Sequence, residues 1–313
     1  MTRFEGCFFF RLLVMYPSQI DFPFYRLLFE CTVSGPLLFF TSRRGETIKG
    51  LIAGEAKKFF PCPPDAPCEK CQVENCDYIR FFRTDLSSSA FTYCIIPPLR
   101  PRSTYYHGEN FYFEIRLFGD CARFDYVLKY LAPAVEQGGL LQGIGGWYKD
   151  SDRHFGRFRL KSIYLWQADA WNRIFFGSKG FTVKSPAPVS FKEAYNTQGR
   201  EFSGISFYTP CCLKRQKQVL NQPDLNDIAY FSAMRLRSVC GNQKMQMEGD
   251  VFDNQGPSRS EFTQVEQAKN SRYFIGEISA RIPETTVPLL MAGSLCHIGK
   301  GVSQGYGGFF LRE

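Results

Sequence analysis

A glycine-rich stretch near the carboxyl end of the chain combines residue types that could hold a phosphate group. It contains Gly299, Gly301, Gly305, Gly307 and Gly308, with Lys300, Ser303, Gln304 and Tyr306 between them and His297 just ahead. Glycine allows a backbone amide to turn toward an anion with no Cβ in the way. Lys300 adds a positive charge, and Ser303 and Gln304 add hydrogen-bond donors. The pattern predicts an anion-binding loop between a helix and a terminal strand; a flexible hairpin is the alternative.

A second cluster of reactive residues consists of cysteines in a proline-rich segment. Cys62, Cys68, Cys71 and Cys76 lie within fifteen residues. Four thiolates can complete a tetrahedral zinc site, and the Cys68-x-x-Cys71 step has the spacing of a zinc knuckle. Only one such step is present, so free thiols are the alternative. A closed set of four ligands leaves no position for water, so we expect a structural zinc and no catalytic metal.

Basic residues gather at two further places. Arg43 and Arg44 form a basic turn ahead of a helix predicted over residues 46–60, which carries Lys49. Arg157, Arg159 and Lys161 share one face of a predicted strand, and His154 lies in the glycine loop that precedes it. Cations in these patterns suit a phosphate backbone, although a solvated helix face and an exposed strand edge explain them nearly as well.

Bulk composition narrows the functional classes. The 313 residues are 44% apolar, enough for one large core or two smaller ones, and the formal net charge of +8 suits a polyanionic partner. With Phe 32 and Tyr 16, aromatic rings are available for strands and for stacking on bases. The twelve cysteines occur without a secretory signal or an apolar run of about 18 residues, so we expect a reducing, cytoplasmic setting and no membrane partner. Sequence motifs of dinucleotide-binding enzymes, P-loop proteins and serine hydrolases are absent.

Hydrophobic periodicity divides the chain into two similar halves. Strands are predicted at 25–33, 90–96, 111–117, 205–209 and 273–282, and helices at 46–60, 124–137 and 224–239. In the strand at 111–117, apolar residues alternate with Asn110, Tyr112, Glu114 and Arg116, which indicates one buried face. We expect an α+β protein of two tandem ferredoxin-like (RRM-like) domains with glycine-rich loops. These would span 25–200, with a Cys-rich zinc-knuckle-like insertion at 60–80, and 201–313, after an N-terminal extension at 1–24.

Several stretches carry a resemblance to a known family. They are Thr47-Ile-Lys-Gly, Cys76-Asp-Tyr-Ile-Arg-Phe, Phe111 to Gly119 with Gly143-Ile-Gly, Phe207-Tyr-Thr-Pro-Cys-Cys-Leu-Lys, and Cys296-His-Ile-Gly-Lys-Gly-x-x-x-Gly-Tyr-Gly. Together they resemble the RAMP superfamily of CRISPR-associated proteins, most closely its repeat-RNA processing endoribonucleases (the "Cas six" family). The resemblance covers about residues 25–313, and the terminal loop is its most specific part.

This resemblance implies metal-independent cleavage of precursor CRISPR RNA within the repeat, with the RNA bound as a hairpin or a single strand. The 2′-OH would attack the adjacent phosphate and leave 2′,3′-cyclic phosphate and 5′-OH ends. The implied catalytic residues are His297 as acid or base, with Lys300, Lys49 and Tyr306. The implied RNA-binding residues are Arg43, Arg44, Gly299, Gly301, Ser303, Gln304, Gly305, His154, Arg157, Arg159 and Lys161. The first helix departs from the family pattern because it has no histidine.

Two other functions fit the same residues. A non-catalytic RAMP subunit would use the glycine loops to hold guide RNA beside other subunits of a CRISPR effector. A zinc-stabilised protein-interaction module would bind no nucleic acid at all. Cleavage of a repeat RNA separates the first from an endoribonuclease, and salt-dependent RNA binding excludes the second.

Overall fold

The protein is described by a computed structural model. It covers residues 14–15, 19–40, 43–63, 67–70, 73, 76–83, 86, 92–99, 102–144, 156–195, 200–240, 244–245, 259–268 and 271–313. Cys71 and His154 lie outside the described residues, so the roles predicted for them are not addressed by the structure.

The first half of the chain forms an antiparallel sheet. Its strands lie in the order β4 (Thr92–Ile96), β6 (Asn110–Phe118), β2 (Pro23–Val33), β7 (Phe158–Gln167), β8 (Ala170–Phe176) and β9 (Gly180–Phe181), with β10 (Val189–Ser190) paired to β2. The alternating strand predicted at 111–117 is confirmed as β6. Its apolar residues face a core with Leu27 and Phe29 of β2. We call this the inner face of the first sheet and the opposite one its outer face.

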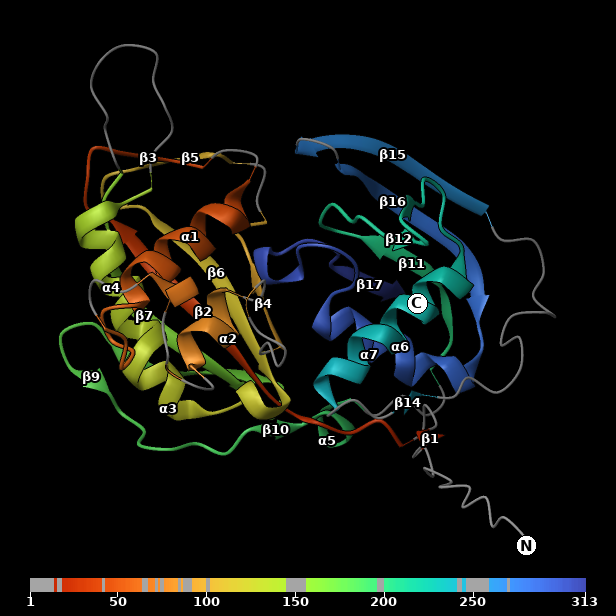
Figure 1. The fold of residues 1–313 in the computed structure, drawn as a ribbon, viewed down its shortest axis with the longest axis horizontal. Coiled ribbons are helices and arrows are strands. Elements are labelled where there is room, and N and C mark those ends of the chain that lie inside the picture. Colours follow the sequence, from red (N-terminus) through yellow and green to blue (C-terminus); the bar gives the residue numbers. More distant parts are fainter. Residues whose placement is uncertain are drawn as a thin grey trace, which may run out of the picture.

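Helices cover the inner face (Figure 1). They are α1 (Arg44–Ala56), α2 (Asp77–Phe82), α3 (Phe124–Tyr126), a π-helical segment (Val127–Leu131), α4 (Ala132–Gln137) and a second π-helical segment (Gly138–Gln142). The helix predicted at 124–137 is confirmed, but the helical segment does not end there and continues through Gly138 and Gly139 to Gln142. A Cβ on Gly138 would lie 2.4 Å from Leu51, and one on Gly139 would lie 2.6 Å from Phe158. These glycines therefore let the helical segment pack closely on α1 and β7.

The second half forms a smaller antiparallel sheet in the order β15 (Arg259–Ala268), β16 (Ser271–Ile282), β11 (Phe202–Phe207) and β17 (Phe309–Arg312). Two helices, α6 (Leu225–Val239) and α7 (Val287–Cys296), pack against one face of it (Figure 1). The helix predicted at 224–239 is confirmed as α6. Asp224 and Asp227 bond reciprocally to each other's backbone amides at its start, which satisfies amides that a helix N-terminus leaves open.

Short elements complete the described chain. They are β1 (Val14–Met15) paired with β14 (Lys244–Met245), β3 (Leu37–Phe39) with β5 (Thr104–Tyr106), β12 (Lys214–Arg215) with β13 (Gln218–Val219), α5 (Phe191–Ala194), and 3-10 turns at Cys68–Lys70, Gly119–Cys121, Glu284–Thr286 and Val302–Gln304. Every helix in the described residues is too short or too polar to cross a bilayer.

A second hydrophobic core is shared by the two halves, beside the core that lies wholly within the first half. Phe24, Phe118 and Trp166 extend from the outer face of the first sheet into the cluster formed by α6, α7 and the second sheet. Burial of these large rings from water stabilises the contact between the halves. The halves are therefore held in one arrangement, and a site built from both is well defined.

Candidate functional site

The glycine-rich loop lies where the two halves meet. Helix α7 leads into residues 297–308, which return as β17, so the predicted order of helix, loop and strand is confirmed. The loop packs against the end of β4, where a Cβ on Gly305 would lie 2.4 Å from the Ile95 carbonyl oxygen. Gly305 also has a φ of +87°, a conformation that favours glycine. Both the close approach of Ile95 and the positive φ therefore require glycine at this position.

Helix α1 of the first half packs on the same loop through its first turns. Its Gly45 lies so close to the loop that a Cβ there would come within 1.7 Å of the Gln304 carbonyl oxygen. One turn further, Lys49 Nζ donates a hydrogen bond of 2.9 Å to Ser303 Oγ. The Tyr306 hydroxyl donates one of 3.0 Å to Glu46 Oε1. The structure thus brings together five predicted site residues: Lys49, Ser303, Gln304, Gly305 and Tyr306.

Further predicted cations lie near this contact. Arg43 is exposed at the start of α1, with Nη1 3.6 Å from Glu46 Oε2. Arg44 Nη1 donates a hydrogen bond of 2.7 Å to the Pro98 carbonyl and lines a pocket of about 220 Å³ together with Gln304 and Tyr306. Lys300 is exposed on the loop itself. The start of α1 and the glycine-rich loop therefore form one cationic site, which we call the α1–loop site.

Many backbone amides of the loop hold the loop itself. The amide of Lys300 donates to the Cys212 carbonyl, that of Gln304 to Gly301, and that of Gly307 to Pro210. The prediction that glycines free the loop amides for an anion is therefore wrong for these positions. Side chains, above all the lysines, are better placed to meet a phosphate.

His297 is buried at the end of α7. It is 0% exposed and has a φ of +58°. Its Nε2 lies 2.7 Å from the Tyr208 hydroxyl, and its Nδ1 lies 3.2 Å from the Tyr306 carbonyl oxygen. Burial, helped by the nearby charge of Arg116, lowers the pKa of His297 to about 3, so the ring is neutral near pH 7. Both ring nitrogens are engaged within the protein, which favours a role in holding the loop over contact with a substrate.

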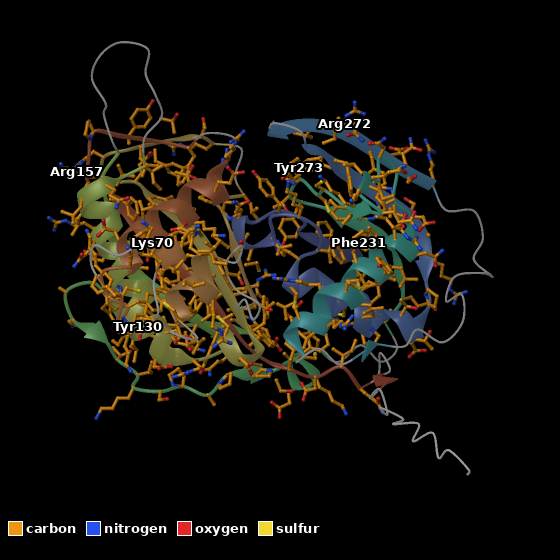
Figure 2. The ribbon with its side chains drawn as sticks, in the orientation of Figure 1. Lys70, Tyr130, Arg157, Phe231, Arg272 and Tyr273 are labelled. Carbon is orange, nitrogen blue, oxygen red and sulfur yellow. The ribbon has the colours of Figure 1, made fainter. Side chains whose placement is uncertain are left out.

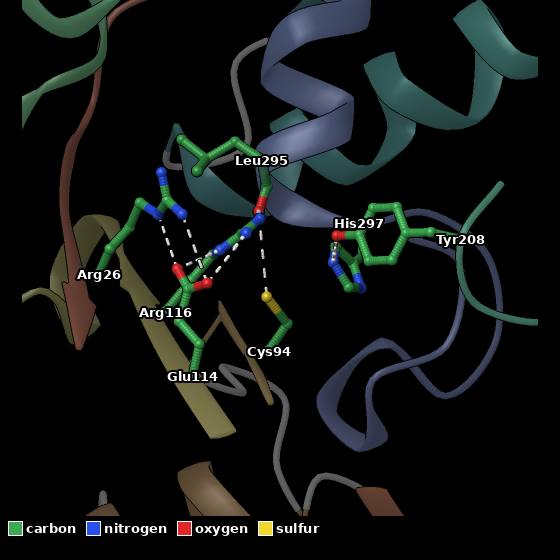
Figure 3. A network of polar contacts seen from close by, with 7 residues as sticks. All are labelled: Arg26, Cys94, Glu114, Arg116, Tyr208, Leu295 and His297. Atoms are coloured by element: carbon green, nitrogen blue, oxygen red, sulfur yellow. Dashed lines mark hydrogen bonds and ion pairs between the residues drawn. The ribbon is translucent and has the colours of Figure 1, made fainter. Parts of the chain in front are cut away.

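Two arginines hold the last turn of α7. Arg116 Nη1, from β6 of the first half, donates a hydrogen bond of 2.9 Å to the Leu295 carbonyl (Figure 3). Arg235, from α6, donates one of 3.2 Å to the next carbonyl, that of Cys296. Cations at a helix C-terminus are favourable because its carbonyls carry partial negative charge. The pair fixes the point from which the glycine-rich loop starts.

Glu114 compensates the buried charge of Arg116. Its carboxylate accepts hydrogen bonds from Arg116 Nε at 2.8 Å and from Arg26 Nε at 2.6 Å (Figure 3). These two arginines outweigh the effect of burial and lower the pKa of Glu114 to about 2, so it stays ionised. The alternation of β6 placed Glu114 and Arg116 on its polar face, but nothing in the sequence indicated that α7 would cover that face. Arg116, Arg235 and Tyr208 were therefore missed as site residues.

The predicted basic face of β7 lies away from the α1–loop site. Arg157, just before the strand, and Arg159 and Lys161 within it are all exposed at alternate positions, as predicted. Figure 2 shows Arg157 at the far edge of the first half and Tyr273, whose ring lies 4.9 Å from that of Tyr306, near the centre of the molecule. The basic face therefore belongs to a separate surface.

The cysteine cluster is described only in part. Cys62 Sγ and Cys76 Sγ lie 3.9 Å apart, and Cys68 is partly buried beside the same core. Among the described residues, no three side chains of His, Cys, Asp or Glu converge on one metal position. The ten described cysteines form no disulfide. The predicted zinc site is thus neither assembled nor tested by the described residues.

Two family models match the two halves of the chain. A family model named AF_1859_N, an N-terminal domain, matches residues 22–187, and the model for the CRISPR-associated endoribonuclease Cas6 matches residues 205–309. No curated protein sequence is significantly similar to the chain.

Solved structures resemble the whole chain at low identity. The Thermus thermophilus Cas6 structure is 13% identical with a TM-score of 0.50, covering 93% of this chain and 98% of that one. A chain of a partial Cas6-RT-Cas1–Cas2 complex is 9% identical with a TM-score of 0.55, covering 93% of this chain and 46% of that one. At such identities the likeness establishes a shared fold.

Proposed function

Because the chain belongs to the Cas6 family of CRISPR-associated endoribonucleases, with an AF_1859_N amino-terminal domain, we propose that it cleaves precursor CRISPR RNA within the repeat. The observation that carries the proposal is the hydrogen bond of 2.9 Å between Lys49 and Ser303, which joins the first helix to the glycine-rich loop. A cationic site made from both halves suits an RNA strand that runs between them. The RNA would be a repeat hairpin or single strand.

The proposed reaction is an internal transesterification that needs no metal. The ribose 2′-oxygen forms a bond to the adjacent phosphorus while the bond from phosphorus to the 5′-oxygen breaks. The 2′-OH proton passes to a base, and the 5′-oxygen gains a proton. The products are a 2′,3′-cyclic phosphate and a 5′-OH. Negative charge accumulates on the phosphate oxygens during this step, so fixed cations beside them lower the barrier.

Lys49 and Lys300 supply these cations in our proposal. Lys49 is partly buried beside Ser303, which fixes its ammonium group relative to the loop. Lys300 projects from the loop, and Arg43 lies at the start of α1 to bind an adjoining phosphate. Tyr306 donates to Glu46, and this bond couples the loop to α1.

His297 acts as a positioning residue in this proposal. The contact of its ring with the Tyr306 carbonyl joins the two ends of the loop. The contact with the Tyr208 hydroxyl ties the loop to the segment after β11. A His297→Gln variant should retain the pH dependence of the cleavage rate seen in the parent. Loss of one limb of that profile, with a rate reduced about 10²–10⁴-fold, would instead identify His297 as the acid or base.

The alternative is a non-catalytic subunit that holds guide RNA among other CRISPR effector subunits. Burial of His297 favours it, since no histidine among the described residues is exposed at the α1–loop site. The two functions differ in one assay. A 5′-labelled repeat RNA is incubated with the protein in excess EDTA, and the products are tested for a 2′,3′-cyclic phosphate. Cleavage at one position supports the endoribonuclease. Salt-sensitive binding without cleavage supports the subunit, and no binding excludes both.

We further infer that the two sheets are tandem ferredoxin-like domains, near 25–200 and 201–313. Each half has the order strand, helix, strand, strand, helix, strand, as in β2, α1, β4, β6, α4 and β7. In both sheets the first and third of the four strands are central, which supports this assignment.

We also propose a structural zinc in the cysteine-rich segment. Two ligands at about 2.3 Å from a tetrahedral zinc lie roughly 3.8 Å apart, and the Cys62 and Cys76 sulfurs lie 3.9 Å apart. Neither cysteine forms a disulfide, which fits a reducing setting such as the cytoplasm. Elemental analysis should find about one zinc per chain, and Cys62→Ser should lower both the zinc content and the melting temperature. Equal zinc content in parent and variant contradicts the site.

A further inference from the structure

A second pocket opens on the outer face of the first sheet, where β4 leaves β6. Pairing between these strands ends at Ile96 and Glu114, whereas β6 stays paired to β2 as far as Asn110. Pro97 and Pro98 follow Ile96, and because proline has no amide hydrogen they cannot extend the ladder. Among the described residues, the edge of β6 at 110–113 therefore has no strand partner on the β4 side.

The pocket lies between this edge and residues 97–99 and has a volume of about 310 Å³. Phe111 and Phe113 line it, yet their side chains are only 1% and 3% exposed because they face the core. Their contribution is therefore backbone, and the amides and carbonyls of residues 110–113 that do not bond to β2 can serve as donors and acceptors along this edge. Tyr112, between them, points to the outer face and is 42% exposed.

These features match an unpaired nucleobase. A base has a flat face that stacks on tyrosine and an edge of donors and acceptors that hydrogen-bonds to a backbone. The Tyr112 ring is already oriented, since its hydroxyl donates 3.1 Å to Glu30 Oε1. The volume is at the small end of ligand sites and suits one nucleoside-sized group.

The pocket adjoins the α1–loop site. Residues 97–99 line both pockets, with Gln304 and Tyr306 on the other side of the shared wall. A strand with one phosphate at the α1–loop site therefore brings a neighbouring nucleotide to the pocket. On the same face, Lys161 forms an ion pair of 2.9 Å with Glu30, the residue that accepts the Tyr112 hydroxyl hydrogen bond.

We propose that this pocket binds one unpaired base of the RNA whose phosphate lies at the α1–loop site, and that Tyr112 stacks on that base. The inference rests on the proposed function and adds a point of sequence recognition to it. A peptide strand added to the β6 edge is less suited, because the open edge spans only residues 110–113 and residues 97–99 stand over it.

The test uses a repeat RNA with 2′-deoxyribose at the cleavage position, so that binding is measured without reaction. 2-Aminopurine is placed in turn at each position beside that phosphate. We expect one position to lose fluorescence on binding, and Tyr112→Ala to restore it. Tyr112→Phe keeps the stacking ring and should still quench the fluorescence, although it loses the hydroxyl bond to Glu30. Tyr230→Ala is the matched control, because Tyr230 lies on α6 and is 41% exposed.

Coupling between base and ring decides the result. An abasic site at that position and Tyr112→Ala should each weaken binding about 5- to 100-fold, and their combination should weaken it no more than either alone. Additive effects, or a Tyr112→Ala loss equal to that of Tyr230→Ala, overturn the pocket assignment. If the pocket assignment is overturned but the parent still cleaves the RNA, the proposed function is retained. A parent that neither binds nor cleaves the RNA overturns both.

Discussion

The close packing of α1 on the glycine-rich loop is open to a direct test by Gly45→Ala. The added Cβ would lie 1.7 Å from the Gln304 carbonyl oxygen and 2.6 Å from its carbon. These are backbone atoms, so no side-chain rotation relieves the overlap. Ordinary contact begins at 3.4 Å, so the loop or the helix must move by about 1.7 Å, the difference between the two distances.

Such a shift is large for a reacting site. It breaks the contact between Lys49 and Ser303 and moves Lys49 relative to the loop. Because a displacement of about 1 Å can cost roughly 10²-fold in rate, we expect the cleavage rate to fall about 100-fold or more. Helix propensity works in the opposite direction, since alanine is favoured over glycine by about 1 kcal/mol in a helix. The gain in helix propensity therefore offsets part of the stability lost through the steric overlap. The effect of Gly45→Ala should appear mainly in the cleavage rate.

Gly50→Ala is the matched control on the same helix. Gly50 is exposed, and a Cβ there would meet no atom within 4 Å. Single-turnover cleavage of repeat RNA at saturating protein is measured for both variants, with urea unfolding to compare stability. Gly50→Ala should cleave as the parent and unfold at slightly higher urea. Equal cleavage by the two variants would mean that α1 and the loop are not in contact in the active protein.

The remaining predictions concern three charged or titrating side chains. Lys49→Met should lower the single-turnover rate about 10²–10³-fold with a much smaller change in RNA affinity, whereas Lys129→Met, on an exposed helix face, should change neither. Since burial lowers the pKa of His297 from 6.5 to about 3, the unfolded chain binds a proton that the folded chain excludes. Stability should therefore fall by about 1.4 kcal/mol per pH unit as the pH drops from about 6.5 toward 3, and His297→Gln should flatten this slope in urea unfolding. Arg116→Met should lower the free energy of unfolding by about 3–5 kcal/mol. Arg123→Met, which removes an exposed ion pair, should lower it by less than about 1 kcal/mol. Equal losses would contradict the role of Arg116 in holding the last turn of α7.

Hydrophobic periodicity predicted most of the main elements. Strands β6 and β16 and helix α6 lie close to their predicted bounds because their apolar residues recur at the strand or helix period over nine or more residues. Strand β15 was not predicted because its sequence is largely polar. It lies at the edge of the second sheet, where polar residues are tolerated. The extension of the helix past Gly138 was also missed. Glycine reads as a helix end in sequence, and only the neighbouring Leu51 and Phe158 reveal its packing role.

Site residues that lie close together in the sequence could be predicted. Residues whose role depends on contacts between the two halves of the chain could not. The glycine spacing marked the loop, and the basic residues before and within α1 marked its partner. Burial of His297 could not be read from the sequence, because it depends on Tyr208 and on Arg116 from the first sheet. The open edge of β6 likewise depends on where β4 departs, although Pro97 and Pro98 were a visible signal for that point.

The shared core has a consequence for how the molecule comes apart. Since Phe24 and Trp166 of the first half are buried in one cluster with residues of the second half, each half alone would expose apolar surface that the other covers. Calorimetry should show a single melting transition instead of one for each half. A chimaera that takes its first half from a distant relative should aggregate unless the matching surface of α6 and α7 is exchanged with it.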